Sequence, residues 1–292
     1  MNFYDEVSTL TFEIGEDSAI VTDCYKRATS VEIPIAVNGI RVRRIAKKAF
    51  LGCKILSRVI VPDSVESIDE WAFAHCAGLK EICLPQRTIE FGKGVFEGDR
   101  SLSRICVANQ EDGVAELLAI AAVVMDAQYL IDTNDAGSEQ WYRKWDYKLR
   151  DILEAKDDEG YHLYILCGEE DLHFDYDEYV ALRRRRKAGL CIERLLHDNM
   201  LDDGLRHTIT NYLLEQRPSR EYGGCFAYVE LEHADDEVYY EKLIELKVID
   251  NDNLECVLER LDERHARMKA YLLKTLTAAA EDDFFARVLN LL

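Results

Sequence analysis

The clearest pattern of apolar and polar residues is a segment that occurs three times in the first third of the chain. Residues 45–62 return as residues 68–85 and, with more changes, as residues 91–108, so that equivalent positions are 23 residues apart. A strict period carried by apolar residues predicts stacked coils whose equivalent side chains form ladders through the core. The expected inward ladders are Ile45/Ile68/Phe91, Phe50/Phe73/Phe96, Leu56/Leu79/Leu102, Val59/Ile82/Ile105 and Val61/Leu84/Val107.

The last residues of each coil alternate as a strand does, which predicts a second, outward set of ladders. One outward column contains opposite charges on neighbouring coils, which suits cross-strand ion pairs. Two interpretations remain open: the column is a solvated ladder that fixes the register, or it belongs to a partner-binding face. The candidate face consists of Arg58, Ile60, Glu81, Cys83, Arg104 and Cys106.

The repeat I-P-x-x-V-x-x-I-x-x-x-A-F-x-x-C-x-x-L-x-x-V-x-I-P closely resembles BspA-like leucine-rich repeats over about residues 8–108. The resemblance implies a short right-handed β-solenoid with an N-terminal β-hairpin cap at residues 10–14 and 19–21. Residues 30–34 would open the first coil. Many relatives carry an export signal and far more repeats, and neither is recognisable in this sequence. The association of those relatives with the cell surface is therefore not expected to apply here.

The remainder of the chain has helical spacing of its apolar residues, with Ser138 as a plausible N-cap. A motif of helix, acidic cap and helix occurs near Asp202 and again near Asp250, about 48 residues later. It resembles stacked ankyrin- or HEAT-like helix pairs, although any helical bundle would show amphipathic pairs. We therefore predict an α+β protein with two domains: residues 1–109 as the repeat domain and residues 110–292 as an acidic all-α domain.

Charge and cysteine content narrow the class of partner and the compartment. The net charge is −20, of which residues 1–109 contribute −1 (14 basic, 15 acidic) and residues 110–292 contribute −19 (22 basic, 41 acidic). Such a surface repels phosphate, so nucleic acid is not an expected partner. Neither a signal peptide nor a transmembrane segment is recognisable, so we expect no membrane association and a cytoplasmic location. The nine cysteines show neither CxxC spacing nor paired histidines and are expected to be free thiols.

One basic run stands out within the acidic domain. It comprises Arg183, Arg184, Arg185, Arg186 and Lys187. Five consecutive helical positions cover the whole circumference, so some of these side chains must face acidic neighbours. The run either compensates nearby carboxylates at positions 169–171, 175, 177 and 178, or docks an acidic partner.

No arrangement of residues with a known catalytic spacing is present. The seven histidines form no HExxH pair, and there is neither a GxSxG serine nor a phosphate-binding glycine loop. Cys83 and Cys106 are expected side by side, but the adjacent ladder positions offer no histidine, so we predict no metal and no cofactor. The segment 233–237 could in principle hold a metal but is better explained as a capped helix start. We expect a non-enzymatic scaffold or adaptor that binds a protein; the alternative is an enzyme or small-ligand binder with a cryptic pocket in the helical domain.

Overall fold

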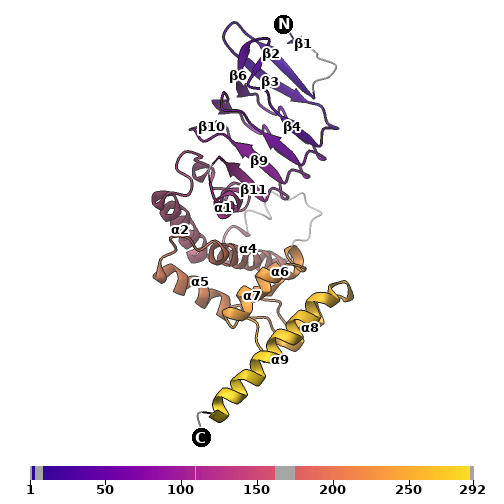
Figure 1. Ribbon diagram of the computed structural model, residues 1–292, viewed down its shortest axis with the longest axis vertical. Coiled ribbons are helices and arrows are strands. Elements are labelled where there is room, and N and C mark those ends of the chain that lie inside the picture. The colour runs from indigo at the N-terminus through magenta and orange to yellow at the C-terminus, as the bar shows by residue number, and fades with distance from the viewer. Residues whose placement is uncertain (1, 4–8, 109, 162–174, 290–292) are drawn as a thin grey trace. The chain divides into compact units, whose positions relative to one another are not determined.

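The computed structural model (Figure 1) describes residues 2–3, 9–108, 110–161 and 175–289. The chain forms two compact units, Met1–Lys148 and Leu149–Leu292. The first unit is longer than the predicted repeat domain, because the helices that follow the repeats pack against the last coil. The predicted boundary near residue 109 marks the end of the repeats. The boundary between the two compact units lies inside helix α2 (Glu139–Glu154).

A β-hairpin begins the solenoid, as predicted. Strand β2 (Leu10–Ile14) pairs antiparallel with β3 (Ala19–Cys24), and the Gly15 amide donates to the Ser18 carbonyl at 2.9 Å across the turn. A short strand, β1 (Asn2–Phe3), pairs with the free side of β2. Strand β3 then pairs in parallel with the first coil, so the hairpin covers the apolar end that the coil would otherwise expose.

The first three coils each contribute a strand to both of two sheets, and the last coil contributes β11 to one of them (Figure 1). The four-stranded sheet has the order β11-β9-β7-β4, and all its neighbouring strands are parallel. The other sheet joins the hairpin to the coils in the order β1-β2-β3-β6-β8-β10, with β5 paired to β6. The strands of the coils are β4 (Ser30–Glu32), β5 (Ala36–Val37), β6 (Ile40–Ile45), β7 (Arg58–Ile60), β8 (Ser67–Ile68), β9 (Glu81–Leu84), β10 (Glu90–Phe91) and β11 (Arg104–Val107).

The phenylalanine ladder forms the centre of the solenoid core. The rings of Phe50 and Phe73 are stacked with their centroids 4.6 Å apart, and those of Phe73 and Phe96 are 5.8 Å apart. The backbone repeats with the same period, since the Phe50 amide donates to Ala72 at 2.7 Å and the Phe73 amide to Val95 at 3.0 Å. The inward positions of the predicted ladders are buried, apart from a partly exposed Phe91 on the edge strand β10.

The first coil differs from the others in length. Ser30 pairs with Arg58, which makes this coil 28 residues long, whereas Arg58 pairs with Glu81 after 23. The additional residues form the small hairpin of β5 and β6. Its turn contains Asn38 and Gly39 with φ of 52° and 82°, the left-handed conformations that a two-residue hairpin turn requires.

The last coil contains Asp99, a buried acid at the ladder position that cysteines occupy in the two preceding coils. Its Oδ1 accepts a hydrogen bond from the Cys76 amide at 2.7 Å, whereas Oδ2 has no partner among the described residues. Burial raises the pKa of Asp99 to about 7, although the Cys76 amide lowers it. Asp99 therefore provides a hydrogen-bond acceptor for the Cys76 amide, but its own carboxyl group is buried and can titrate.

Helices cover the last coil. Helix α1 (Asp112–Val123) packs against β11, and the next segments are η1 (Gln128–Leu130) and α2 (Glu139–Glu154). Two buried tryptophans of α2 fix this arrangement: the indole of Trp145 donates to Leu117 at 3.1 Å and that of Trp141 to Leu130 at 2.8 Å. Ser138 accepts from the Trp141 amide at 3.1 Å, which confirms it as the N-cap of α2.

The second unit is helical in the part that the structure describes. Its helices after α2 are α4 (Tyr176–Leu196), α5 (Asp203–Glu215), α6 (Phe226–Glu232), α7 (Glu237–Glu245), α8 (Leu254–Arg260), η2 (Glu263–His265) and α9 (Ala266–Leu289). None of the helices among these described residues is long and apolar enough to cross a lipid bilayer.

The predicted motif of helix, acid and helix is present twice, with different capping. Asp202 caps α5 by accepting from the Leu205 amide at 2.9 Å. At the second occurrence, Asn253 precedes α8, and its side chain donates to Val248 at 2.8 Å and accepts from the Asp250 amide at 3.0 Å. Asp236 is the N-cap of α7, as expected for the segment 233–237.

Replacing Phe73 by alanine should lower the free energy of unfolding of the first unit by about 3–5 kcal/mol, because the side chain is fully buried between two other rings. All three tryptophans (Trp71, Trp141 and Trp145) belong to this unit, so tryptophan fluorescence during denaturation measures it selectively. Tyr147→Ala, which removes a 73% exposed ring from the same unit, is the matched control. If Phe73→Ala left the free energy of unfolding almost unchanged, the ladder register would be wrong.

Asp99→Asn should make the first unit less sensitive to pH. Because the folded pKa of Asp99 is raised from 3.8 to about 7, the folded state binds more protons than the unfolded state between these values. Its contribution to stability is therefore full below pH 3.8 and falls, by up to about 1.4 kcal/mol per pH unit, until the pH passes 7. The variant, compared with the parent by tryptophan fluorescence, should lack this component and be the more stable protein above pH 7. If the stability of the parent and that of the variant changed with pH in the same way, Asp99 would not titrate as a buried group.

Candidate functional site

The outward side chains of the four-stranded sheet form two parallel rows, and together we call them the outer face. One row is Ser30, Arg58, Glu81 and Arg104, and the other is Glu32, Ile60, Cys83 and Cys106. The register places all six predicted residues together and adds Ser30 and Glu32 from the first coil. The alternation of residues 30–34, which matches residues 58–62, was the available signal for these two, but the longer first coil breaks the period.

Ion pairs connect the charged row, as the alternation of sign predicted. Arg58 Nε lies 2.6 Å from Glu81 Oε1, and Arg104 Nε lies 3.7 Å from Glu81 Oε2. The side chains of Arg58, Glu81 and Arg104 are 53%, 27% and 33% exposed. Such exposed pairs stabilise the sheet only weakly, but their alternation favours the observed register.

Arg104 has additional partners on α1, which the sequence did not reveal. Its guanidinium forms an ion pair with Asp112, and Arg104 Nη1 lies 3.6 Å from Glu116 Oε1. The hydrogen bond to Asp112 raises the pKa of Arg104. The helix therefore borders the outer face at β11, and Arg58 is the more available of the two arginines.

The second row brings two thiols next to the carboxylate of Glu81. Cys83 and Cys106 are directly opposite on neighbouring parallel strands, as predicted. The Sγ of Cys83 lies 3.8 Å from Glu81 Oε1 and 3.9 Å from Arg58 Nη2. Burial raises the pKa of Cys106 to about 11, so this thiol is protonated at neutral pH. Side-chain ligand atoms of Glu81, Cys83 and Cys106 all lie within 4.8 Å of one another.

The basic run of α4 does not form one exposed patch. Lys187 is buried, and its Nζ lies 2.8 Å from Asp157 Oδ1, while Arg184 Nε lies 2.8 Å from Asp157 Oδ2. Burial alone would raise the pKa of Asp157, but the hydrogen bonds from Arg184 and Lys187 outweigh it and lower the pKa. Intramolecular compensation is thus observed for two members of the run, and Lys187 is not accessible to a partner.

The carboxylate that compensates them differs from those we expected. Asp175 is the N-cap of α4, accepting from the Asp177 amide at 2.9 Å, and residues 169–171 lie outside the described residues. Of the other members of the run, Arg186 is exposed, and Arg183 and Arg185 are partly exposed. A partner-binding role remains a proposal for these three arginines only.

A buried carboxylate in the second unit joins three helices. Glu193 of α4 accepts hydrogen bonds at 2.7 Å from Tyr228 of α6 and from Tyr239 of α7, both on Oε1. His233 lies beside it, with Nε2 at 3.1 Å from the Tyr228 hydroxyl and its ring stacked on Tyr239 at 3.8 Å. Burial raises the pKa of Tyr228. The tyrosines donate to the carboxylate, and the open depression at residues 231–236 is lined by His233 but not by Glu193, so the cluster joins the three helices as a hydrogen-bonded network.

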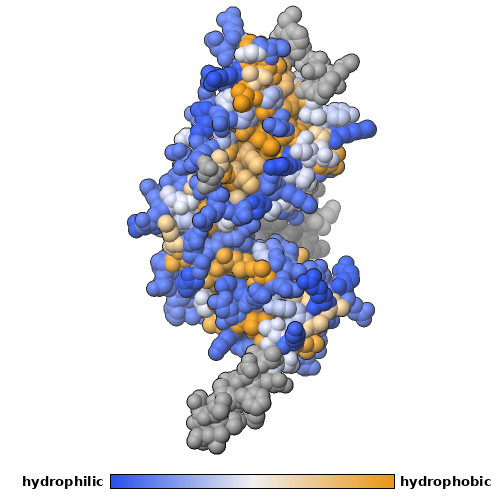
Figure 2. Space-filling view, viewed as in Figure 1, coloured by the Kyte–Doolittle hydropathy of each residue, from blue (hydrophilic) through white to orange (hydrophobic). Residues whose placement is uncertain are grey.

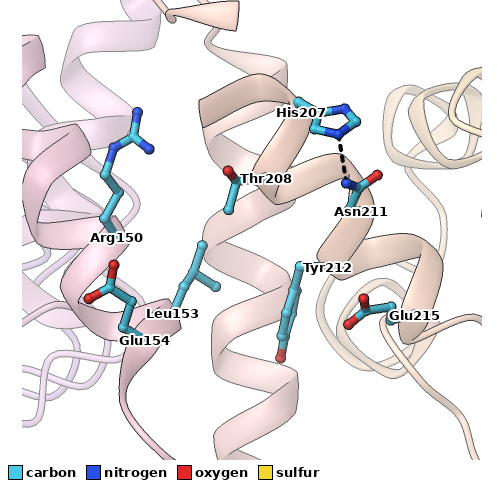
Figure 3. Close-up of a pocket in the computed structure, with 8 residues that line it drawn as sticks. All are labelled: Arg150, Leu153, Glu154, His207, Thr208, Asn211, Tyr212 and Glu215. Atoms are coloured by element: carbon cyan, nitrogen blue, oxygen red, sulfur yellow. Dashed lines mark hydrogen bonds between the residues drawn. The ribbon is translucent and has the colours of Figure 1, made fainter. Parts of the chain in front are cut away.

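The second unit also contains a pocket of about 420 Å³ between the end of α2 and helix α5 (Figure 3). Side chains of α2 lie on one side of the opening and those of α5 on the other, and the Tyr212 hydroxyl points away from His207. The His207 Nε2 lies 2.9 Å from the Asn211 amide nitrogen, and Arg150 is paired with Asp202 at 2.9 Å. The pocket is partly open and lined mostly by polar residues; His207 and Asn211 are bonded to each other, whereas the buried Tyr212 hydroxyl has no hydrogen-bond partner among the described residues.

Fold and outer face together define a leucine-rich-repeat solenoid followed by a helical region. The family described as BspA type Leucine rich repeat region (6 copies) matches residues 18–115, and these residues are a BspA-type leucine-rich repeat region. No curated protein matches the chain.

The similar solved structures are bacterial leucine-rich-repeat proteins. A leucine-rich repeat protein of T. pallidum is 28% identical with a TM-score of 0.27, covering 32% of this chain and 56% of its own. A leucine-rich repeat protein of Bacteroides ovatus is 26% identical with a TM-score of 0.31, covering 34% and 28%. A leucine rich cell surface protein of Faecalibacterium prausnitzii is 24% identical with a TM-score of 0.33, covering 37% and 31%. The chain thus spans about half or less of the length of these three proteins.

Replacing Lys187 by methionine should destabilise the second unit by about 1–3 kcal/mol, because Asp157 loses a buried partner and keeps only Arg184. Arg185→Met, in the same run but partly exposed, should change stability by less than about 0.5 kcal/mol. Urea denaturation followed by far-ultraviolet circular dichroism measures both. Equal effects of the two substitutions would contradict the distinction between a buried and a solvated member of the run.

Proposed function

We propose that the protein is a non-enzymatic scaffold that binds another protein through the outer face of its solenoid. Leucine-rich repeats generally mediate protein–protein interaction. The observation that carries the proposal is the pair of in-register rows, one of alternating charge and one containing Ile60 and the two cysteines. Figure 2 shows apolar side chains along the solenoid, bordered by hydrophilic ones.

The charge pattern suggests the chemistry of the partner. Arg58 and Arg104 flank Glu81, so a complementary surface would present acidic groups on both sides of a basic or hydrogen-bonding group. The net charge of −20 disfavours nucleic acid and anionic membranes as partners. Arg183, Arg185 and Arg186 of α4 would form a second contact for an acidic protein.

A cytoplasmic location is part of the proposal. All cysteines that the structure describes are free thiols, including the neighbouring pair Cys83 and Cys106. Free thiols on a protein surface are typical of a reducing compartment.

Small-ligand binding in the second unit is the alternative function. The pocket between α2 and α5 favours it, since its volume of about 420 Å³ lies in the range of small-molecule sites. A thermal-shift screen with metabolites distinguishes this function from the scaffold, because a protein-binding face does not respond to small solutes.

The scaffold proposal is tested by exchanging the charges of one ion pair. The double variant Arg58→Glu/Glu81→Arg keeps an internal pair but inverts the outer face, so a partner captured by the intact chain from source-cell lysate should be lost. The matched control is Lys47→Glu/Glu70→Lys, which exchanges another inter-coil pair with a separation of 2.7 Å outside the outer face. The intact chain and the control should capture the same protein.

Two outcomes would contradict the proposal. One is capture of the partner by the outer-face variant at the level of the control. The other is failure of the intact chain to capture any protein. Circular dichroism of both variants should match that of the parent, because each exchange conserves the net charge and one inter-coil ion pair; the outer-face variant loses only the longer contact of residue 81 with Arg104, at 3.7 Å.

A further inference from the structure

We propose that Glu81, Cys83 and Cys106 form a binding site for a thiophilic divalent cation of the zinc class. The site lies on the outer face but does not rest on the proposed scaffold function, because it needs no partner protein. It differs from our expectation from the sequence, which predicted no metal. The structure adds the position of the Glu81 carboxylate, which the sequence considered only as an ion-pair partner.

The strands hold the three groups in one place. Cys83 and Cys106 are paired in register on β9 and β11, and Glu81 precedes Cys83 by two residues, so its side chain emerges on the same side of the sheet. The ligand atoms lie within 4.8 Å of one another. Two sulfurs on one tetrahedral zinc ion are about 3.8 Å apart, given Zn–S bonds of about 2.3 Å. The ligand atoms therefore have to approach one another by about 1 Å at most to close the site.

The chemistry of the ligands selects the ion. Two thiolates and one carboxylate favour zinc or cadmium, whereas magnesium and calcium prefer oxygen ligands alone. Three protein ligands leave a fourth tetrahedral position for water or for a side chain of a bound protein. When the ion binds, both thiols release their protons, so the ligand set gains two negative charges and, with the carboxylate, carries three.

Neighbouring arginines act on the site in two opposite ways. Arg58 contacts both Glu81 and Cys83, at 2.6 Å and 3.9 Å, and must give up the carboxylate when the metal binds. Arg104 lies on the other side of Glu81, where Asp112 and Glu116 of α1 hold its guanidinium. Both arginines compete with the cation, and both also offset the charge of the thiolates. Because Arg58 is bonded to two of the ligands, its competition should dominate.

The other described thiols do not offer an equivalent site. Cys24, Cys53 and Cys76 form a ladder inside the solenoid core, and Cys191 and Cys225 are buried in the second unit. Cys256 is partly exposed on α8 but belongs to no group of three ligands among the described residues. It therefore serves as the matched control for a substitution of a surface cysteine.

The test is a titration of the full chain with cadmium in the presence of a reducing agent that contains no thiol. Binding is measured by the ultraviolet charge-transfer absorption of cadmium–thiolate bonds. Zinc affinity is measured by competition with a chromophoric chelator. One equivalent should bind, and Cys83→Ser or Cys106→Ser should each lower the affinity by at least about tenfold. Cys256→Ser should leave it unchanged. Arg58→Gln should increase the affinity, an effect that a merely structural arginine would not produce.

The affinity should also rise with pH, because each thiol must lose its proton before it binds the metal. The groups that face the thiols are Glu81, Arg58 and Arg104, with Asp112 and Glu116 behind Arg104.

Three results would overturn the site: absence of the charge-transfer band, a loss in Cys256→Ser equal to that in Cys83→Ser, or an affinity independent of pH. None of them concerns capture of a protein partner. Failure of the metal site and failure of the scaffold proposal are therefore distinguishable.

Discussion

The structure depends on hydrogen bonds between successive coils, and these bonds leave each end of the solenoid with unpaired groups. Every coil donates to and accepts from its neighbours, as the Phe50 amide does to Ala72 and the Phe73 amide to Val95. At the N-terminus the hairpin β2–β3 continues the sheet into β6. At the other end Asp99 supplies a carboxylate to the Cys76 amide, and α1 packs on β11. A solenoid with so few coils is stable only because both ends are covered.

The same stacking that builds the core also arranges the surface. Because equivalent residues lie directly beside one another, a sequence alternating Arg, Glu and Arg every 23 residues becomes a connected row of ion pairs. A cysteine recurring with that period becomes a pair of adjacent thiols. The outer face thus has chemistry that no single coil possesses, and both our proposals concern groups that only the register brings together.

The sequence predicted the features that follow the period and missed those that depend on tertiary packing. Ladder residues, the N-terminal hairpin and the neighbouring positions of Cys83 and Cys106 were predictable, because one repeat length determines them all. Ser30 and Glu32 were missed because the first coil is longer. The partners of Arg104 on α1 were also missed, and so was the burial of Lys187 against Asp157, 30 residues earlier in the chain. Such contacts depend on how helices pack, which periodicity does not specify.

The central claim is that the outer face contacts a protein partner, and footprinting of its thiols tests it most directly. The chain is alkylated with a small maleimide in the presence and absence of the captured partner, and labelling rates are read by mass spectrometry. The account predicts slower labelling of Cys83 and Cys106 in the complex and an unchanged rate at Cys256, which is partly exposed in the second unit. Equal labelling of Cys83 and Cys106 with and without the partner would contradict it.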